Sequence, residues 1–203
     1  MHHIPDTAPQ PDNEPWIVGV TGSIGGGKST FARALCTQNA DIQAFHIDAD
    51  QLVHDGLKSG GAAVHRVLAA FPCASDGIGG IDRTKLANLV FQDLQADDLQ
   101  TDDLQADELQ ASDPQALRRL ESILHPIVSE MREQLIKQNR DRSFIVLDVP
   151  LLFETETWRR CDLTILVTTD EAVRARRTLA RPGMTMARLQ AILARQMPDS
   201  HKA

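Results

Sequence analysis

Four short apolar runs stand out along the chain, separated by segments with the wider spacing of helices. The runs cover residues 17–20, 44–47, 144–147 and 163–167. Runs of this length that are rich in Val, Ile and Leu are typical of strands buried in a parallel sheet. Helical spacing is found over residues 29–36, 117–138 and 171–179. Because strands alternate with helices, the pattern predicts an α/β fold with a parallel sheet and right-handed crossovers.

The stretch between the second and third runs, residues 51–113, is too long for a simple crossover. Its apolar residues recur with helical spacing, so we expect a helical insertion that forms the acceptor-binding side of a cleft. Within it, residues 93–112 form an acidic tandem pentapeptide, whose period fits neither a helix nor a strand. This repeat is either a partner-binding segment or an expansion tolerated in a surface loop.

Length and composition fit one main domain that carries small insertions. A chain of 203 residues that is 42% hydrophobic can bury one substantial core but is short for two independent domains. We expect a disordered tail over residues 1–15, which are rich in proline, and a domain over 16–203. The core of this domain is predicted to consist of residues 16–50 and 114–173.

Charge and cysteine content narrow the possible partners. A net charge of −7 argues against a surface for nucleic acid or for an anionic membrane. Cys36, Cys73 and Cys161 are odd in number and widely spaced, so neither a disulfide framework nor a zinc site is indicated. No segment approaches the length of an apolar membrane span. We therefore expect a cytoplasmic protein without nucleic-acid or membrane partners, and the sequence does not indicate its oligomeric state.

Residues 22–29 read Gly-Ser-Ile-Gly-Gly-Gly-Lys-Ser and fit G-x-x-x-x-G-K-[ST] directly after the first predicted strand. Backbone N–H groups must turn inward around a phosphate, and glycine permits the required dihedral angles. Lys28 would lie over the β- and γ-phosphates, and Ser29 would offer its hydroxyl to Mg²⁺. The alternative is a glycine-rich turn that matches by chance. With a strand before it and a helix after it, the motif favours binding of ATP with Mg²⁺. The residues expected to contact the nucleotide are Gly22, Ser23, Ile24, Gly25, Gly26, Gly27, Lys28, Ser29 and Thr30.

Three aspartates follow predicted strands. Asp48 and Asp50 come after the second strand, at the carboxyl edge where open α/β sheets bind ligands, and alternation would put both on one side. Such a pair suits an acceptor-hydroxyl base together with a ligand to Mg²⁺-bound water. Asp50 could also be a helix N-cap. Asp148 ends the third strand, where a carboxylate reaches metal-bound water, or it could be a structural cap.

A basic stretch follows the fourth predicted strand. Helical spacing brings Arg174, Arg177 and Arg181 onto one face, where they could stabilise the charge of a transferring phosphate. Pro182-Gly183 would break the helix and could serve as a hinge, so we expect a lid over residues 174–198. The alternative is a solvated helical face. His125, which precedes a proline inside a helical pattern, is by itself more typical of a structural residue.

Together these residues resemble the dephospho-coenzyme A kinase family, P-loop kinases that phosphorylate the ribose 3′-hydroxyl of dephospho-CoA. Residues 21–30 resemble its phosphate loop, residues 46–50 its second-strand signature and residues 81–91 its helical acceptor region. Leu-His-Pro at 124–126 and Pro-Leu-Leu-Phe-Glu at 150–154 are the most family-specific elements. The resemblance covers the chain from the first predicted strand onward, apart from the repeat.

The resemblance implies a three-layer P-loop NTPase fold with a parallel sheet, a helical acceptor-binding insertion and a lid. It implies that Asp50 is the general base, that Lys28 and Ser29 hold MgATP with the loop amides, and that Arg177 and Arg181 belong to the lid. Asp148 is expected to join Ser29 at the metal. Residues expected on the side of dephospho-CoA are Thr21, Asp48, Arg83, His125, Pro150, Leu151, Leu152 and Glu154.

This sequence departs from the family pattern in three places. Ser23 stands where glycine is usual, and Pro182-Gly183 replaces a commoner acidic residue. Residues 196–203 resemble the start of the family's C-terminal region, whose final strand and helix are missing from this sequence. We expect such a loss to expose a sheet edge and to weaken stability or nucleotide-base binding.

The leading hypothesis is therefore an ATP-dependent kinase acting on dephospho-CoA. One alternative is a P-loop kinase for another small metabolite or nucleotide. Another is an ATP-binding protein that is inactive because its C-terminal region is short. A GTPase is not favoured, because the guanine-reading pattern Asn-Lys-x-Asp does not occur in the chain.

Overall fold

The computed structural model describes residues 14–38, 43–90 and 114–203. The chain forms two compact units: unit 1 consists of Met1–Ala49 and Glu133–Ala203, and unit 2 of Asp50–Arg132. The second boundary lies inside a long helix, so unit 2 takes in residues 114–132, which the sequence assigned to the core. The pentapeptide repeat at 93–112 and residues 1–13 of the predicted tail lie outside the described residues.

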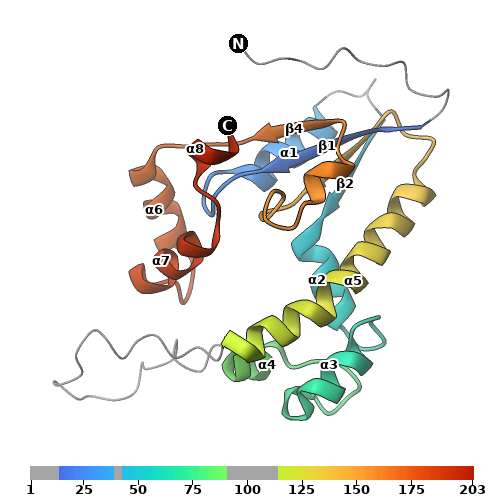
Figure 1. The fold of residues 1–203 in the computed structure, drawn as a ribbon, viewed down its shortest axis with the longest axis vertical. Helices are drawn as coiled ribbons and strands as arrows, with labels where there is room; N and C mark the ends of the chain where they lie inside the picture. Colours follow the sequence, from blue (N-terminus) through green and yellow to red (C-terminus); the bar gives the residue numbers. More distant parts are fainter. Residues whose placement is uncertain (1–13, 39–42, 91–113) are drawn as a thin grey trace. The chain divides into compact units, whose positions relative to one another are not determined.

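Unit 1 contains a four-stranded parallel sheet (Figure 1). Its strands are β1 (Trp16–Thr21), β2 (Ala44–Asp48), β3 (Phe144–Asp148) and β4 (Leu163–Leu166). They lie in the order β2-β3-β1-β4, and every neighbouring pair is parallel. The predicted α/β fold with a parallel sheet is therefore confirmed, with strand ends within one residue of those expected.

The register of the sheet brings the carboxyl ends of β1, β2 and β3 together. Asp148 at the end of β3 is paired with Val20 of β1 and with Asp48 of β2. β1 and β3 are largely buried as predicted, whereas β2 and β4, which were also expected to be buried, are mostly half-buried or exposed. Within the described residues β4 is an edge strand, and Leu163 at its start is 53% exposed.

Both faces of β1 are covered by chain from unit 1. On one face, α1 (Lys28–Thr37) packs through Ala32 against Val18, Val20 and Val146. On the opposite face, Gly19 lies under the turn that follows β3, and a Cβ atom there would come within 2.9 Å of a Leu152 methyl group. Side chains alternate between the two faces of β1, so the face that contacts α1 and the phosphate loop is opposite to the face that contacts the turn after β3.

Three helices follow β4 in unit 1 (Figure 1). They are α6 (Glu171–Leu179), α7 (Met186–Arg195) and α8 (Asp199–Lys202), and a short 3₁₀ helix, η3 (Thr157–Arg160), precedes β4. The side chain of Asp170 caps α6 by accepting from the N–H groups of Ala172 and Val173, as aspartate often does. Pro182-Gly183, the predicted hinge, lies in the connection between α6 and α7, where Gly183 has a φ of 68°.

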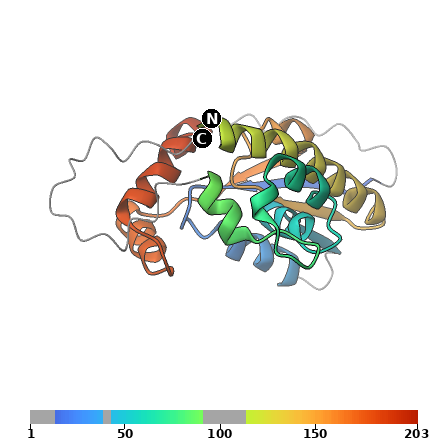
Figure 2. The same cartoon turned by 90° about the horizontal axis from the view of Figure 1, so that it is seen from below.

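Unit 2 is helical (Figure 2). It contains most of α2 (Ala49–Leu57), α3 (Val64–Ala70), the 3₁₀ turn η1 (Pro72–Ala74), α4 (Arg83–Val90) and the first part of α5 (Pro114–Gln138). Its core is made of apolar side chains from all of these elements: Leu57, Ala63, Val67, Phe71, Ala74, Ile81, Leu86, Val90, Leu120 and Ile127. Pro126 lies inside α5 without ending it. No helix of the described ranges is long and apolar enough to cross a membrane.

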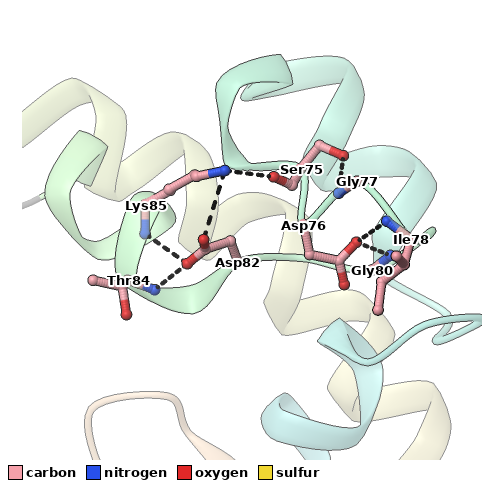
Figure 3. A network of polar contacts seen from close by, with 8 residues as sticks. All are labelled: Ser75, Asp76, Gly77, Ile78, Gly80, Asp82, Thr84 and Lys85. Carbon is pink, nitrogen blue, oxygen red and sulfur yellow. Dashed lines mark hydrogen bonds and ion pairs between the residues drawn. The ribbon is translucent and has the colours of Figure 1, made fainter.

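Two aspartates shape the loop between η1 and α4 (Figure 3). Asp76 accepts from the N–H groups of Ile78 (2.9 Å) and Gly80 (2.8 Å), and the hydrogen bonds from Gly80 and Ile78 lower its pKa. Asp82 accepts from the N–H groups of Thr84 and Lys85 and so holds the start of α4. This arrangement fixes the backbone on either side of Arg83.

Candidate functional site

The phosphate loop has the backbone that its glycines predict. Gly25 and Gly27 adopt φ values of 77° and 95°, which glycine reaches without the strain that a side chain brings. The loop turns on itself through a hydrogen bond from the N–H of Gly26 to the carbonyl of Ser23, 2.9 Å long. α1 begins directly after Gly27, which has no side chain to cap it. The first amides of α1 and its positive dipole end are therefore suited to an anion.

Lys28 and Asp148 form a buried ion pair at the base of this loop. The side chain of Asp148 is fully buried, that of Lys28 is 10% exposed, and the ammonium donates to Oδ1. Burial would by itself raise the pKa of Asp148. The polar contact with His46, the hydrogen bond and positive charge of Lys28, and the contact with Ser29 together outweigh burial and lower the pKa of Asp148. Ser29 and Asp148, the two predicted metal ligands, are thus brought together.

The donor set at this position fits a divalent cation. His46, Asp48 and Asp148 each offer a ligand atom, and these atoms lie within 4.8 Å of one another. Asp148 Oδ2 is buried and lies 3.5 Å from His46 Nε2, and the described residues give it no hydrogen bond of normal geometry. Carboxylate and hydroxyl oxygens are the ligands that Mg²⁺ prefers, so Asp148, Asp48 and Ser29 suit this ion.

His46 was not among the predicted site residues, although a signal for it exists in the sequence. His46 and Asp48 are two positions apart on β2, and alternation puts them on one face of the sheet. Its ring nitrogen beside Asp148 Oδ2 helps to orient the carboxylate that faces the loop.

A cleft of about 590 Å³ lies beside the phosphate loop in unit 1. Its walls are Gly25, Gly27, Thr30, Phe31, Ala34, Arg177 and Arg181. The two predicted lid arginines therefore face the same space as the loop. Arg174, predicted on their helical face, instead lies between Glu171 and Asp199, 3.9 Å from an oxygen of Asp199.

Comparisons with known proteins agree with this geometry. A family model described as dephospho-CoA kinase matches residues 16–101 and 99–203. The chain belongs to the dephospho-CoA kinase family. A dephospho-CoA kinase from Paramagnetospirillum magneticum is 43% identical over 92% of this chain and 77% of that protein. One from Rhodospirillum rubrum is 40% identical over 90% and 76%. A crystal structure of TT1252 from Thermus thermophilus has a TM-score of 0.70 and 31% identity, covering 93% of this chain and 84% of that one.

In this dephospho-CoA kinase family member, three residues expected at the acceptor or as the base lie in unit 2. Asp50 is exposed in the first turn of α2. It is not the N-cap, and alternation with Asp48 does not continue, because α2 already begins at Ala49. Arg83 at the start of α4 contacts Nδ1 of His54 at 2.7 Å, and His125 is exposed on α5. Their roles stay predictions.

The turn after β3, the family-specific Pro-Leu-Leu-Phe-Glu segment, lies partly in the interior of unit 1. Leu152 is fully buried, and so is Thr21, whose hydroxyl donates to the carbonyl of Pro150 at 3.2 Å. Pro150 and Leu151 are half-buried. Thr21 and Leu152 thus support the turn in this structure, and their expected contact with dephospho-CoA stays a prediction.

Two residues from the end of the chain contact the phosphate loop and were not predicted. Gln196 Oε1 accepts from the N–H of Ile24 at 3.1 Å, and Asp199 Oδ1 accepts from Ser23 Oγ at 2.7 Å. No local sequence pattern could indicate contacts between residues so far apart in the chain. The sequence offered only one sign, namely that Ser23 replaces the usual glycine.

Proposed function

We propose that the chain catalyses ATP-dependent phosphorylation of the ribose 3′-hydroxyl of dephospho-CoA, giving coenzyme A and ADP, the last step of coenzyme A synthesis. The observation that carries this proposal is the Lys28–Asp148 pair beneath the uncapped start of α1, beside a cleft that Arg177 and Arg181 line. Phosphoryl transfer needs this combination of positioned donors and cations more than it needs covalent chemistry by the protein.

The phosphates of ATP bind at the loop amides and Lys28 in this proposal. Arg177 and Arg181 contribute two guanidinium groups to the cleft, where they neutralise charge on the transferring γ-phosphoryl group. Thr30 and Phe31 line the same cleft, so in this proposal they form its wall along α1, next to the nucleotide. The half-exposed face of α1 thus has a binding role in addition to its packing against the sheet.

Ser29 and Asp148, with Asp48, would hold Mg²⁺ directly or through water. The ion, when bound, neutralises phosphate charge and orients the phosphate oxygens. The fit rests on the buried Asp148 Oδ2, which has no hydrogen-bond partner among the residues that the structure describes, and on the lowered pKa that keeps Asp148 ionised.

Asp50 is the proposed general base. The acceptor oxygen attacks the γ-phosphorus while its proton passes to the Asp50 carboxylate, and the bond from the γ-phosphorus to the bridging oxygen breaks to release ADP. Asp50 is exposed in the first turn of α2, so its carboxylate is accessible to solvent and solutes. Arg83, whose guanidinium is held by His54, suits recognition of the acceptor's phosphates.

The test is acceptor-dependent ADP release by the full chain with MgATP. Dephospho-CoA is compared with phosphopantetheine and with nucleosides, and Lys28→Ala is the inactive control. Asp50→Asn should lower kcat by at least about a hundredfold, in the range of general-base catalysis. Asp55→Asn is the matched control, because Asp55 lies on the same helix and its side chain is 41% exposed.

Each result decides between the stated functions. ADP formation with dephospho-CoA alone supports the assignment. Turnover with a different acceptor would show a kinase for another metabolite, and ATP binding without any turnover would show an inactive binder. Full activity of a folded Asp50→Asn protein would refute the base.

A further inference from the structure

A C-terminal segment of unit 1 is hydrogen-bonded to the first part of the phosphate loop. Residues 196–202 are called the C-terminal clasp below. Gln196 accepts from the backbone N–H of Ile24, and Asp199 accepts from the hydroxyl of Ser23. The 2.7 Å separation between Ser23 Oγ and Asp199 Oδ1 is typical of a hydroxyl that donates to a carboxylate. The clasp therefore contacts the loop at two successive residues, once through backbone and once through a side chain.

Asp199 joins the loop to a second element. Its other oxygen, Oδ2, lies 3.9 Å from the guanidinium of Arg174 on α6, and both side chains are largely shielded from solvent. Ser23 is only 5% exposed, so water competes poorly for its hydroxyl. A single carboxylate thus connects the phosphate loop with the helix that carries Arg177.

The clasp is itself anchored to the turn after β3. Glu154 Oε1 accepts from the backbone N–H of Met197 at 2.6 Å and lies 3.6 Å from the ammonium of Lys202. The Lys202 side chain is fully buried. A buried cation needs a counter-charge close by, so Glu154 restricts where Lys202 can lie. The hydrogen bond from Met197 to Glu154 restricts the backbone at residue 197. Glu154 therefore holds the clasp in place, a role separate from its expected contact with dephospho-CoA.

We propose that Asp199 and Gln196 are positioning residues that hold Ser23 and Ile24 so that the loop amides converge before MgATP arrives. The inference rests on the proposed function and deepens it. Binding is tighter when donors are already placed, because less order is lost on association. The serine at position 23 supplies the hydroxyl for this contact, which a glycine there could not supply.

The test measures the Kd of MgATP for the full chain by calorimetry in the absence of acceptor. Asp199→Ala and Ser23→Gly should each raise the Kd about tenfold, the effect of losing a hydrogen bond to a charged group. The double variant should be no weaker than either single variant, because both remove the same contact. Asp199→Asn, which keeps an acceptor oxygen, should stay within about threefold of the parent. Asp141→Ala removes an exposed charge in the same unit and should change nothing.

Steady-state kinetics separate positioning from general destabilisation. Positioning raises the KM for MgATP and leaves the KM for dephospho-CoA within about twofold. Partial unfolding would instead lower the active fraction, and so kcat, at unchanged Kd. Should Asp199→Ala fail to fold, Gln196→Ala and Ser23→Gly test the same contacts separately.

An unchanged Kd in Asp199→Ala, or effects that add in the double variant, would overturn the inference. The Kd is measured without an acceptor, so an absence of turnover with dephospho-CoA would refute the proposed function and leave this test intact.

Discussion

Replacement of Gly25 by alanine tests how the phosphate loop is packed against α6. Gly25 has a φ of 77°, and a Cβ atom there would collide with Thr178 Oγ1 and lie 2.9 Å from the carbonyl oxygen of Arg174. The Thr178 side chain cannot move aside freely, because it is buried and its hydroxyl donates to that same carbonyl. The added methyl group must therefore displace either the loop or α6.

The expected loss of stability combines two effects. The left-handed backbone costs about 1–2 kcal/mol for an alanine, and overpacking costs about 1–3 kcal/mol. Gly25→Ala should thus lower the free energy of unfolding by about 2–5 kcal/mol. Gly27→Ala is the matched control, with a φ of 95° and no atom nearer than 3.7 Å to the new Cβ. It should show only the backbone effect of about 1–2 kcal/mol.

Urea unfolding followed by tryptophan fluorescence measures both variants. The tryptophans of the chain, Trp16 and Trp158, lie in unit 1 with the loop. Equal midpoints and slopes for Gly25→Ala and Gly27→Ala would refute the reasoning, because α6 would then not be fixed against the loop.

Three further predictions concern the support of the site. Asp148→Asn should lower the free energy of unfolding at pH 7 by about 3 kcal/mol, since it leaves Lys28 buried without its counter-charge. Because the pKa of Asp148 is lowered in the folded state, its ionised form stabilises the fold above about pH 4, the ordinary pKa range of an aspartate. This contribution is lost as the pH falls through the native pKa. The free energies of unfolding of the parent and of Asp148→Asn should therefore become similar at low pH. Gly19→Ala should cost about 1–3 kcal/mol, because its methyl group meets Leu152, and an unchanged Tm would contradict this packing. Asp170→Ala should cost about 1 kcal/mol through loss of the α6 cap, with Asp170→Asn restoring most of it in the same urea assay.

Much of unit 1 could be predicted from sequence because its determinants are local. The apolar runs located all four strands, and the motif at residues 22–29 located the loop and the start of α1. The family prediction is confirmed by the comparisons. Ser29 and Asp148 could be placed together because carboxyl ends of parallel strands share one edge of a sheet.

The rest depends on contacts that no local pattern encodes. The exposure of Leu163 depends on which strand lies at the edge, since an edge strand and a central strand can have the same apolar run. The start of α2 was expected at Gln51, two residues too late, because helix starts are the least certain part of such patterns. The contact of Asp199 with Ser23 joins residues 176 positions apart, which only the folded chain brings together.

The ion pair between Lys28 and Asp148 makes binding at the loop an exchange of counterions. In the free protein, the Asp148 carboxylate accepts a hydrogen bond from the Lys28 ammonium, the group that a phosphate would contact. An anion that draws the ammonium away leaves a buried negative charge behind, which is unfavourable unless another cation arrives. Free sulfate or orthophosphate brings no such cation, whereas a nucleotide that carries its magnesium does. We therefore expect the loop to discriminate against the abundant simple anions of the cell by charge balance, without any contact to the nucleoside.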